Sequence, residues 1–247
     1  MADLEILVTY RCLHEVLENQ GYSNLVLKQV LSSREVSTRP EIGRWAKARI
    51  TARVYGVVTW TVSIDSILTR FLKKELSDLD GSVRTCLRMG VWELIFAHRG
   101  HTYSGPGRVD VMVSLAKEVC PRGAEGLVNA VLRKVLVLSE GLPLTEDLNS
   151  VIPDFPEKRL DLRYGIKKEI VGCFVKWYGT EKAKLIMKSF LRVPSVTFRV
   201  NTTKVSDREA LLKEMEKEDV RASSGKFFSC EIDLSPSENM SDVIKSA

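Results

Sequence analysis

Apolar residues recur at intervals of three and four along the first 140 residues, which is the spacing of one face of an α-helix. No tract that alternates apolar and polar residues, as a half-buried strand would, competes with this pattern. The pattern therefore predicts an all-helical bundle over residues 1–140. The expected helices cover about 4–17, 23–31, 40–54, 59–76, 79–97, 108–119 and 122–138.

Start and stop signals mark several of these helices. Gly21 ends the first predicted helix, and Ser23 is a candidate N-cap for the second. Pro40 suits the first position of the third helix, which is expected to run towards Gly56 and end there. Residues 100–107 contain three glycines and a proline, which disfavour regular structure, so they are predicted to form a loop.

The second part of the chain changes character. Prolines and glycines interrupt residues 141–160, which are predicted to be a linker, and residues 161–247 then mix helix and strand signals. A strand–helix–strand unit of this size has few partners to close its sheet, so we expect an incomplete α+β segment after the bundle. The expected elements are helices over about 163–178 and 180–191, a strand over 196–203, a helix opened by the capping-box spacing of 206–209, and strands over 220–222 and 227–234. The fold class is mainly α.

Positive charge is concentrated in one block of the sequence. The whole chain has a formal net charge of +5, but residues 157–204 alone carry 12 Lys or Arg and 4 Asp or Glu. Such a block is the electrostatic footprint of a surface that binds phosphate. A solvated lysine-rich helix face has the same composition, so charge alone leaves both interpretations open.

Composition excludes several other classes of protein. No run of about 18 apolar residues is present, so we expect no membrane span, and the N-terminus lacks the features of a signal peptide. The five cysteines are scattered without a Cys-x-x-Cys pair, which indicates a reducing, cytoplasmic setting. His98 and His101 have no cysteine nearby, so no metal site is expected.

Four tracts occur in an order that is typical of one family. They are Val54-Tyr-Gly-Val-Val58, Leu79 to Leu94, Leu115-Ala-Lys-Glu-Val119 and Gly126-Leu-Val-Asn-Ala-Val-Leu-Arg133. This order resembles the NusB domain, an all-helical RNA-associated fold. It is more closely similar to the version fused to the ribosomal RNA cytosine-C5 methyltransferases called Fmu, Sun or RsmB. Three later tracts resemble the segment that joins the two domains in that family: Leu162 to Ile166, Trp177-Tyr-Gly179 and Pro194 to Thr203.

The resemblance implies the RNA-binding, substrate-recognition region of such a methyltransferase, with ribosomal RNA as its partner. Family members use S-adenosylmethionine, a nucleophilic thiolate and a glycine-rich cofactor loop. This sequence has no Pro-Cys dipeptide and no Cys-Ala-x-Pro-Gly-Gly-Lys-Thr tract. We therefore expect the catalytic domain to be absent, with no catalytic residue and no cofactor in this chain, and S-adenosylmethionine to be bound by the parent enzyme.

Two alternatives remain open at this stage. One is a stand-alone NusB-like factor in transcription antitermination or RNA–protein assembly, which would work through a protein partner on the helical domain. The first helix favours some role of this kind, because Arg11 is its one basic residue among several acidic ones, whereas RNA-binding NusB proteins often have an arginine-rich first helix. The other alternative is a decayed gene fragment without activity.

The candidate RNA contacts lie in the basic block. Arg199 and Asn201 alternate on the predicted strand and should share one face. Arginine can bind phosphate with two hydrogen bonds, and asparagine can bind a base or a sugar. The alternatives are that Arg199 pairs with a carboxylate, that Asn201 caps the turn before the next helix, and that the lysines form a solvated exterior. The full candidate set is Lys167, Lys168, Lys182, Lys188, Arg192, Arg199, Asn201 and Lys204.

Other polar and aromatic residues are interpreted as structural. Arg53 falls within the apolar arc of its predicted helix, and a buried arginine needs a carboxylate, for which Glu93 is the candidate. The four tryptophans are expected in the core or at domain interfaces. Stacking on unpaired bases is the alternative for Trp177 and Tyr178. The tryptophans are Trp45, Trp60, Trp92 and Trp177.

Overall fold

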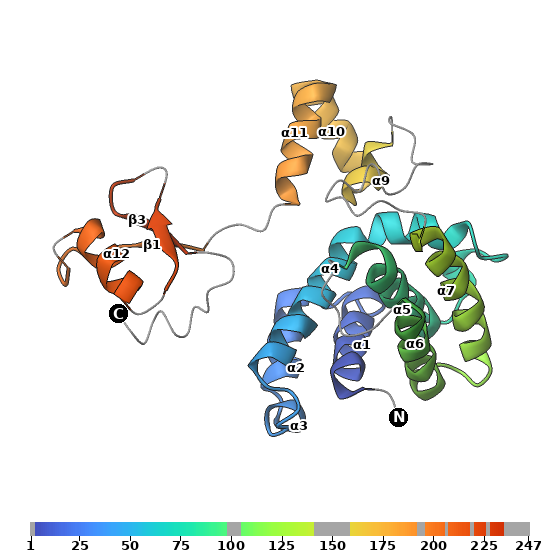
Figure 1. Ribbon diagram of the computed structural model, residues 1–247. Helices are drawn as coiled ribbons and strands as arrows, with labels where there is room; N and C mark the ends of the chain where they lie inside the picture. Colours follow the sequence, from blue (N-terminus) through green and yellow to red (C-terminus); the bar gives the residue numbers. More distant parts are fainter. Residues whose placement is uncertain are drawn as a thin grey trace. The chain divides into compact units, whose positions relative to one another are not determined.

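A computed structural model shows how these elements are arranged (Figure 1). It describes residues 3–97, 105–140, 159–191, 196–205, 207–217, 220–225 and 228–234. The chain divides into two compact units, Met1–Lys184 and Leu185–Ala247, and each is considered by itself. Within the described ranges, no helix combines the length and the apolar character that a membrane crossing requires.

The first unit is all-helical, as the hydrophobic periodicity predicts. Helix α5 is its centre, because it contacts α1, α4, α6 and α7. Two short helical segments accompany the α-helices, the 3-10 turn η1 (Leu76–Asp78) and the π-helical turn η2 (Trp92–Phe96). The α-helices are α1 (Leu4–Leu17), α2 (Ser23–Ser32), α3 (Arg34–Ser37), α4 (Arg44–Thr69), α5 (Gly81–Val91), α6 (Gly105–Val119), α7 (Ala124–Glu140), α9 (Leu160–Tyr164), α10 (Lys168–Tyr178) and α11 (Thr180–Phe190), whose last six residues belong to the second unit.

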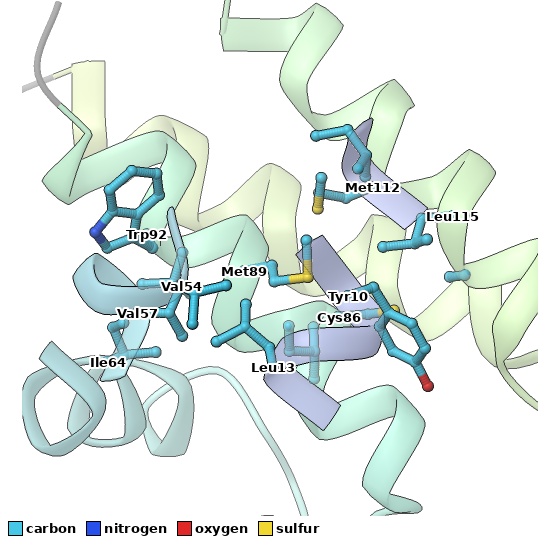
Figure 2. Close-up of a cluster of buried hydrophobic side chains, with 14 of the residues drawn as sticks. Tyr10, Leu13, Val54, Val57, Ile64, Cys86, Met89, Trp92, Met112 and Leu115 are labelled. Atoms are coloured by element: carbon cyan, nitrogen blue, oxygen red, sulfur yellow. The ribbon is translucent and has the colours of Figure 1, made fainter. Parts of the chain in front are cut away.

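A continuous apolar core joins helices α1 to α7. Leu13 of α1, Ile64 of α4 and Leu115 of α6 have no exposed surface, and Met89 of α5 lies among them (Figure 2). Large side chains from three helices thus meet those of the central helix. Burial of this kind is the main favourable term in folding, so this core stabilises the bundle.

The predicted helix break at Gly56 is wrong, because α4 runs through this residue without interruption. A Cβ atom at position 56 would overlap the indole ring of Trp92. Glycine is therefore required for the close approach of η2 to α4, and it does not end the helix. The start of this helix also differs from the prediction, since Gly43 is the N-cap and Pro40 lies before it.

Other boundaries differ by a few residues. Ser23 is the first residue of α2, whose N-cap is Tyr22 without a side-chain hydrogen bond. Helix α6 begins at Gly105, within the segment predicted to be a loop, and residues 98–104 lie outside the described ranges. The linker prediction for 141–160 also falls mostly outside them.

The basic block begins with a short helix that packs on the bundle. The predicted helix over 163–178 is interrupted at Gly165, which has a left-handed φ of 67° and separates α9 from α10. Helix α9 contacts α4, and the hydroxyl of the fully buried Ser63 donates a 2.6 Å hydrogen bond to the carbonyl oxygen of Leu162. A Cβ at Gly165 would overlap the carbonyl oxygen of Thr59. The glycine therefore allows both the turn and the close approach.

The second unit contains a three-stranded antiparallel sheet and one covering helix, which confirms the mixed α+β prediction. The strand order is β1-β3-β2, and α12 contacts β2 and β3. Residues alternate along β3, so that Ile232 and Leu234 are buried. The helix begins after Asp207, whose carboxylate accepts a hydrogen bond from the backbone N–H of Ala210, whereas Ser206 lies outside the described residues. The elements are β1 (Val196–Arg199), α12 (Arg208–Lys217), β2 (Ala222–Ser224) and β3 (Glu231–Leu234).

Candidate nucleic-acid interface

The lysines at the start of α10 are exposed, as an RNA contact requires. Lys167 is the N-cap residue of α10, and Lys168 is its first residue. The free backbone N–H groups of a helix start add positive potential to the two ammonium groups. Glu169 in the same turn offsets part of this charge.

Three aromatic rings and a lysine lie close together where α10 ends and α11 begins. The Nζ atom of Lys182 lies 5.6 Å from the ring centroid of Tyr178, within the range of a cation–π contact. The ring of Phe174 contacts both Tyr178 and Trp177. Lys182 is exposed, so the structure offers it, together with two aromatic rings, to the solvent. The neighbouring Lys184 pairs with Glu181 at 2.8 Å.

Arg199 and the residues after it occupy the end of the first strand. Strand β1 ends at Arg199, earlier than predicted, but the alternation continues, with Val200 buried and Asn201 exposed. Across the sheet, Arg199 is opposite Glu231. The side-chain oxygen of Asn201 accepts hydrogen bonds from the N–H and the hydroxyl of Thr203, at 3.1 and 2.7 Å. The turn-capping interpretation of Asn201 is therefore confirmed for this oxygen.

The candidate residues are distributed over both units. Lys204 is exposed and lies in the turn with Asn201, because its N–H donates to the Asn201 carbonyl oxygen. Lys188 is exposed in the last turn of α11. Arg192 lies outside the described residues. The structure thus groups Arg199, Asn201 and Lys204 at one strand end.

Two of the four tryptophans lie outside the core, which contradicts the core half of the prediction for them and leaves the interface half as a prediction. Trp45 and Trp177 are 69% and 66% exposed, whereas Trp92 is buried and Trp60 stacks on Phe96. The apolar residues of α10 are only partly covered by neighbouring elements. Val171 is buried, whereas Ile170 and Trp177 are exposed. Periodicity reports the width of an apolar arc, but contacts with neighbours decide how much of it is buried.

Arg53 has the structural role that its position in an apolar arc predicts. Its Nε donates to Oε1 of Glu93 at 2.5 Å, which confirms the predicted pair. Its Nη1 also pairs with Glu5, a partner that the sequence pattern missed. Burial raises the pKa of Glu5, but hydrogen bonds from Arg49 and Arg53 outweigh burial, and the pKa is lowered overall. These two arginines hold α1, α4 and η2 together.

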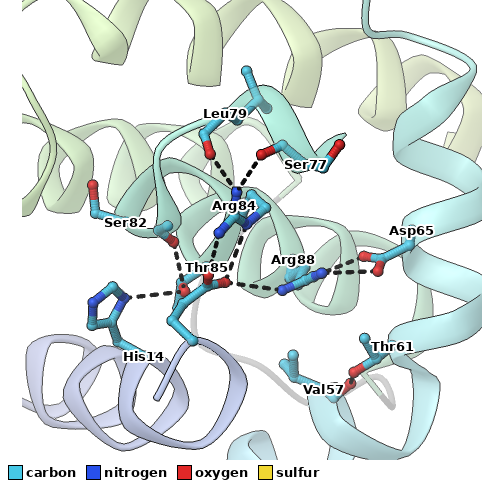
Figure 3. A network of polar contacts seen from close by, with 12 residues as sticks. His14, Val57, Thr61, Asp65, Ser77, Leu79, Ser82, Arg84, Thr85 and Arg88 are labelled. Atoms are coloured by element: carbon cyan, nitrogen blue, oxygen red, sulfur yellow. Dashed lines mark hydrogen bonds and ion pairs between the residues drawn. The ribbon is translucent and has the colours of Figure 1, made fainter. Parts of the chain in front are cut away.

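A second ionic network fixes α5 against α1 and α4 (Figure 3). Arg88 binds both carboxylate oxygens of Asp65, at 2.8 and 2.9 Å, and it also donates to Glu18 at 3.1 Å. Arg84 pairs with Glu18 and donates to the carbonyl oxygens of Ser77 and Leu79. The two arginines of the central helix therefore bind carboxylates of α4 and of the end of α1.

Within the described residues, the sheet of the second unit is not of the doubly wound, parallel type. The sheet is antiparallel, and β1 leads into the Asn201 turn. Nucleotide cofactors in doubly wound folds instead bind at a glycine-rich turn after a parallel strand. Within the described ranges, no group of three or more His, Cys, Asp or Glu side chains could hold a metal ion.

Comparison with known proteins places the helical unit in a family. The model of the NusB family matches residues 8–137, more than half of the 247-residue chain. The chain is also 27% identical over 218 residues to the "Probable ribosomal RNA small subunit methyltransferase B" of Bacillus subtilis (strain 168). That match covers 88% of this chain and 45% of the relative, so the chain spans about half the length of the curated relative.

Comparison with solved structures gives one likeness of fold and one weaker alignment. The crystal structure of PH0851 aligns with a TM-score of 0.59 at 14% identity, covering 98% of this chain and 51% of that one. The structure of T. maritima NusB aligns with a TM-score of 0.47 at 20% identity, over 56% of this chain and 93% of that one. The likeness to PH0851 concerns the fold, and it extends beyond the helical bundle.

Proposed function

The chain belongs to the NusB family, and from this membership we propose that it is the RNA-binding, substrate-recognition region of an S-adenosylmethionine-dependent ribosomal RNA (cytosine-C5) methyltransferase. The observation that carries the proposal is the extent of the Bacillus subtilis match. A match over 218 of 247 residues must include all of residues 30–218, and so it continues past the family match through α10, α11 and β1. The aligned span therefore includes the basic block.

The exposed cations of the basic block supply the RNA contact in this proposal. Lys167, Lys168 and Lys182 bind phosphates, and each such contact releases counterions and makes affinity depend on salt. Lys188, Arg192, Arg199 and Lys204 are further candidates for phosphate contacts, and Asn201 shapes the turn beside Arg199. Arg53 of α4 and Arg84 and Arg88 of α5 are engaged inside the bundle, so in this proposal the contact is made by the lysine-rich helices that follow it.

Charge reversal at two exposed lysines tests the proposal. We expect the full chain with Lys168→Glu and Lys182→Glu to bind small-subunit ribosomal RNA about tenfold more weakly. The slope of log affinity against log salt should fall by about one to two. The matched control is Lys73→Glu with Lys74→Glu, which changes the net charge equally at two exposed positions outside the block. Equal losses in both variants, or no loss in either, would contradict the assignment.

An assembly factor that binds a protein partner is the second candidate. Ile170 and Trp177 lie seven residues apart on α10, and both are exposed on the same side of the helix. Such an apolar stripe is typical of a protein contact. If RNA affinity is unchanged by the lysine reversals but a pulled-down partner is lost with Trp177→Ala, this second function is favoured.

We expect no S-adenosylmethionine binding by this chain, since the cofactor belongs to the catalytic domain of the parent enzyme. Isothermal titration of the full chain with the cofactor should show no saturable heat. Stoichiometric binding in the micromolar range would contradict this part of the proposal. We also propose a cytoplasmic location, because all five cysteines are free thiols, as is usual in a reducing compartment.

A further inference from the structure

Two cysteines that are 34 residues apart in sequence meet in the helical bundle. Cys86 lies on α5, and Cys120 directly follows α6. Their sulfur atoms are 3.6 Å apart, within hydrogen-bond distance for two sulfurs. Cys86 is fully buried among the core side chains (Figure 2), whereas Cys120 is partly exposed. The two thiols therefore differ in access although they touch.

An open pocket of about 620 Å³ reaches only one of the two thiols. Cys120 lines this pocket together with polar side chains of α1 and the start of α5, including His14, Glu18, Asp80 and Ser82. Cys86 is not among the lining residues. A small polar reagent from solvent consequently meets Cys120 first, with Cys86 directly behind it.

The contact also favours the reactive form of the outer thiol. A hydrogen bond with Cys86 lowers the pKa of Cys120, although burial opposes this effect. The same hydrogen bond, together with burial, raises the pKa of Cys86. The thiolate is the nucleophile in sulfur oxidation, so the accessible sulfur is also the one that ionises more readily.

We propose that Cys120 and Cys86 form a peroxide-responsive pair, in which Cys120 is oxidised first and Cys86 closes the disulfide. The Cys120 thiolate attacks one oxygen of a hydroperoxide, the O–O bond breaks, and a sulfenic acid forms with release of hydroxide or alkoxide. The Cys86 sulfur then attacks the sulfenic sulfur, and water leaves as the S–S bond forms. Two thiols are oxidised and one peroxide is reduced.

The expected consequence is a covalent link between the central helix and the end of α6. Closing this loop restricts the unfolded chain, so the oxidised protein should be harder to unfold. The link lies within the bundle, so RNA binding through α10 and α11 does not depend on it. Oxidation of the two cysteines can therefore be tested independently of RNA binding.

The test is peroxide oxidation of the full chain carrying Cys173→Ser and Cys230→Ser, which removes the two accessible thiols outside the pair. One equivalent of hydrogen peroxide should remove two alkylatable thiols and two hydrogen atoms per chain. Peptide mapping should find Cys86 joined to Cys120, the melting temperature should rise by several degrees, and dithiothreitol should reverse both changes. Oxidation of Cys173 in the wild-type chain verifies the peroxide dose.

Two single variants in the same background separate the roles of the sulfurs. With Cys86→Ser, a sulfenic acid should persist on Cys120 and react with dimedone, and Cys86→Ala serves if the serine variant does not fold. With Cys120→Ser, Cys86 should stay reduced. The proposal is overturned if both thiols remain alkylatable after unfolding at a dose that oxidises Cys173, or if dimedone labels Cys86 in the Cys120→Ser protein.

Discussion

Replacing Arg53 by methionine should lower the free energy of unfolding by about 3–5 kcal/mol. The arginine and Glu93 side chains are 9% and 6% exposed, and methionine removes the cation that faces this buried carboxylate. A buried charge that loses its partner keeps its desolvation cost without the compensating attraction. Methionine preserves much of the apolar stem, so the loss reports on charge. Urea unfolding near neutral pH, followed by circular dichroism, measures it.

Arg49→Met is the matched control for this variant. Arg49 pairs with Glu5, as Arg53 does, but its side chain is 53% exposed, and an exposed pair contributes about 1 kcal/mol or less. Adding Glu93→Gln to Arg53→Met should recover part of the loss, because the unpaired charge is removed as well. A loss no larger than that of Arg49→Met would show that Glu93 is not held by Arg53.

The same network makes stability depend on pH through Glu5. Its pKa is lowered in the folded protein from the ordinary value of 4.5, so its contribution is complete above that value. The contribution is lost as the pH falls through the lowered pKa. Arg53→Met removes one cause of the lowering, so acid should affect the variant less steeply than the wild type.

Replacing Gly56 by alanine should destabilise the bundle by about 2 kcal/mol, although alanine is the better helix former by about 1 kcal/mol. The new Cβ would overlap the indole of Trp92, which is buried and has little room to move. Either the ring leaves its position or α4 and η2 separate, and both outcomes lose packing. Thermal unfolding followed by circular dichroism measures the change.

Gly126→Ala provides the comparison within the same bundle. Gly126 lies in α7, and a Cβ there meets no atom within 4 Å. Alanine should therefore stabilise the protein slightly, by about 0.5 kcal/mol. Trp92→Phe should reduce the cost of Gly56→Ala, because the smaller ring leaves space, and the double-mutant cycle should show coupling. Equal effects of both alanine substitutions would contradict the close-packing role of Gly56.

The sequence predicted the second unit and its site less completely than the bundle. The first strand was expected to reach Thr203, but the Asn201 side chain binds the backbone of Thr203, and the strand ends at Arg199. A local side-chain hydrogen bond competes with sheet pairing at this point. The exposure of Trp177 was missed for another reason. The spacing of apolar residues along a helix does not show which of them other elements will cover.

The sequence by itself determined the helical bundle of the first 140 residues, the mixture of helices and strands after it and the position of the basic block, because periodicity and charge are properties of the chain alone. It also located the buried Arg53–Glu93 pair, since an arginine in an apolar arc requires a carboxylate. Only the tertiary structure decided that Gly56 lies within one long helix and that Cys86 meets Cys120. Both outcomes depend on residues that are distant in sequence and adjacent in space, and no local pattern records which residues those will be.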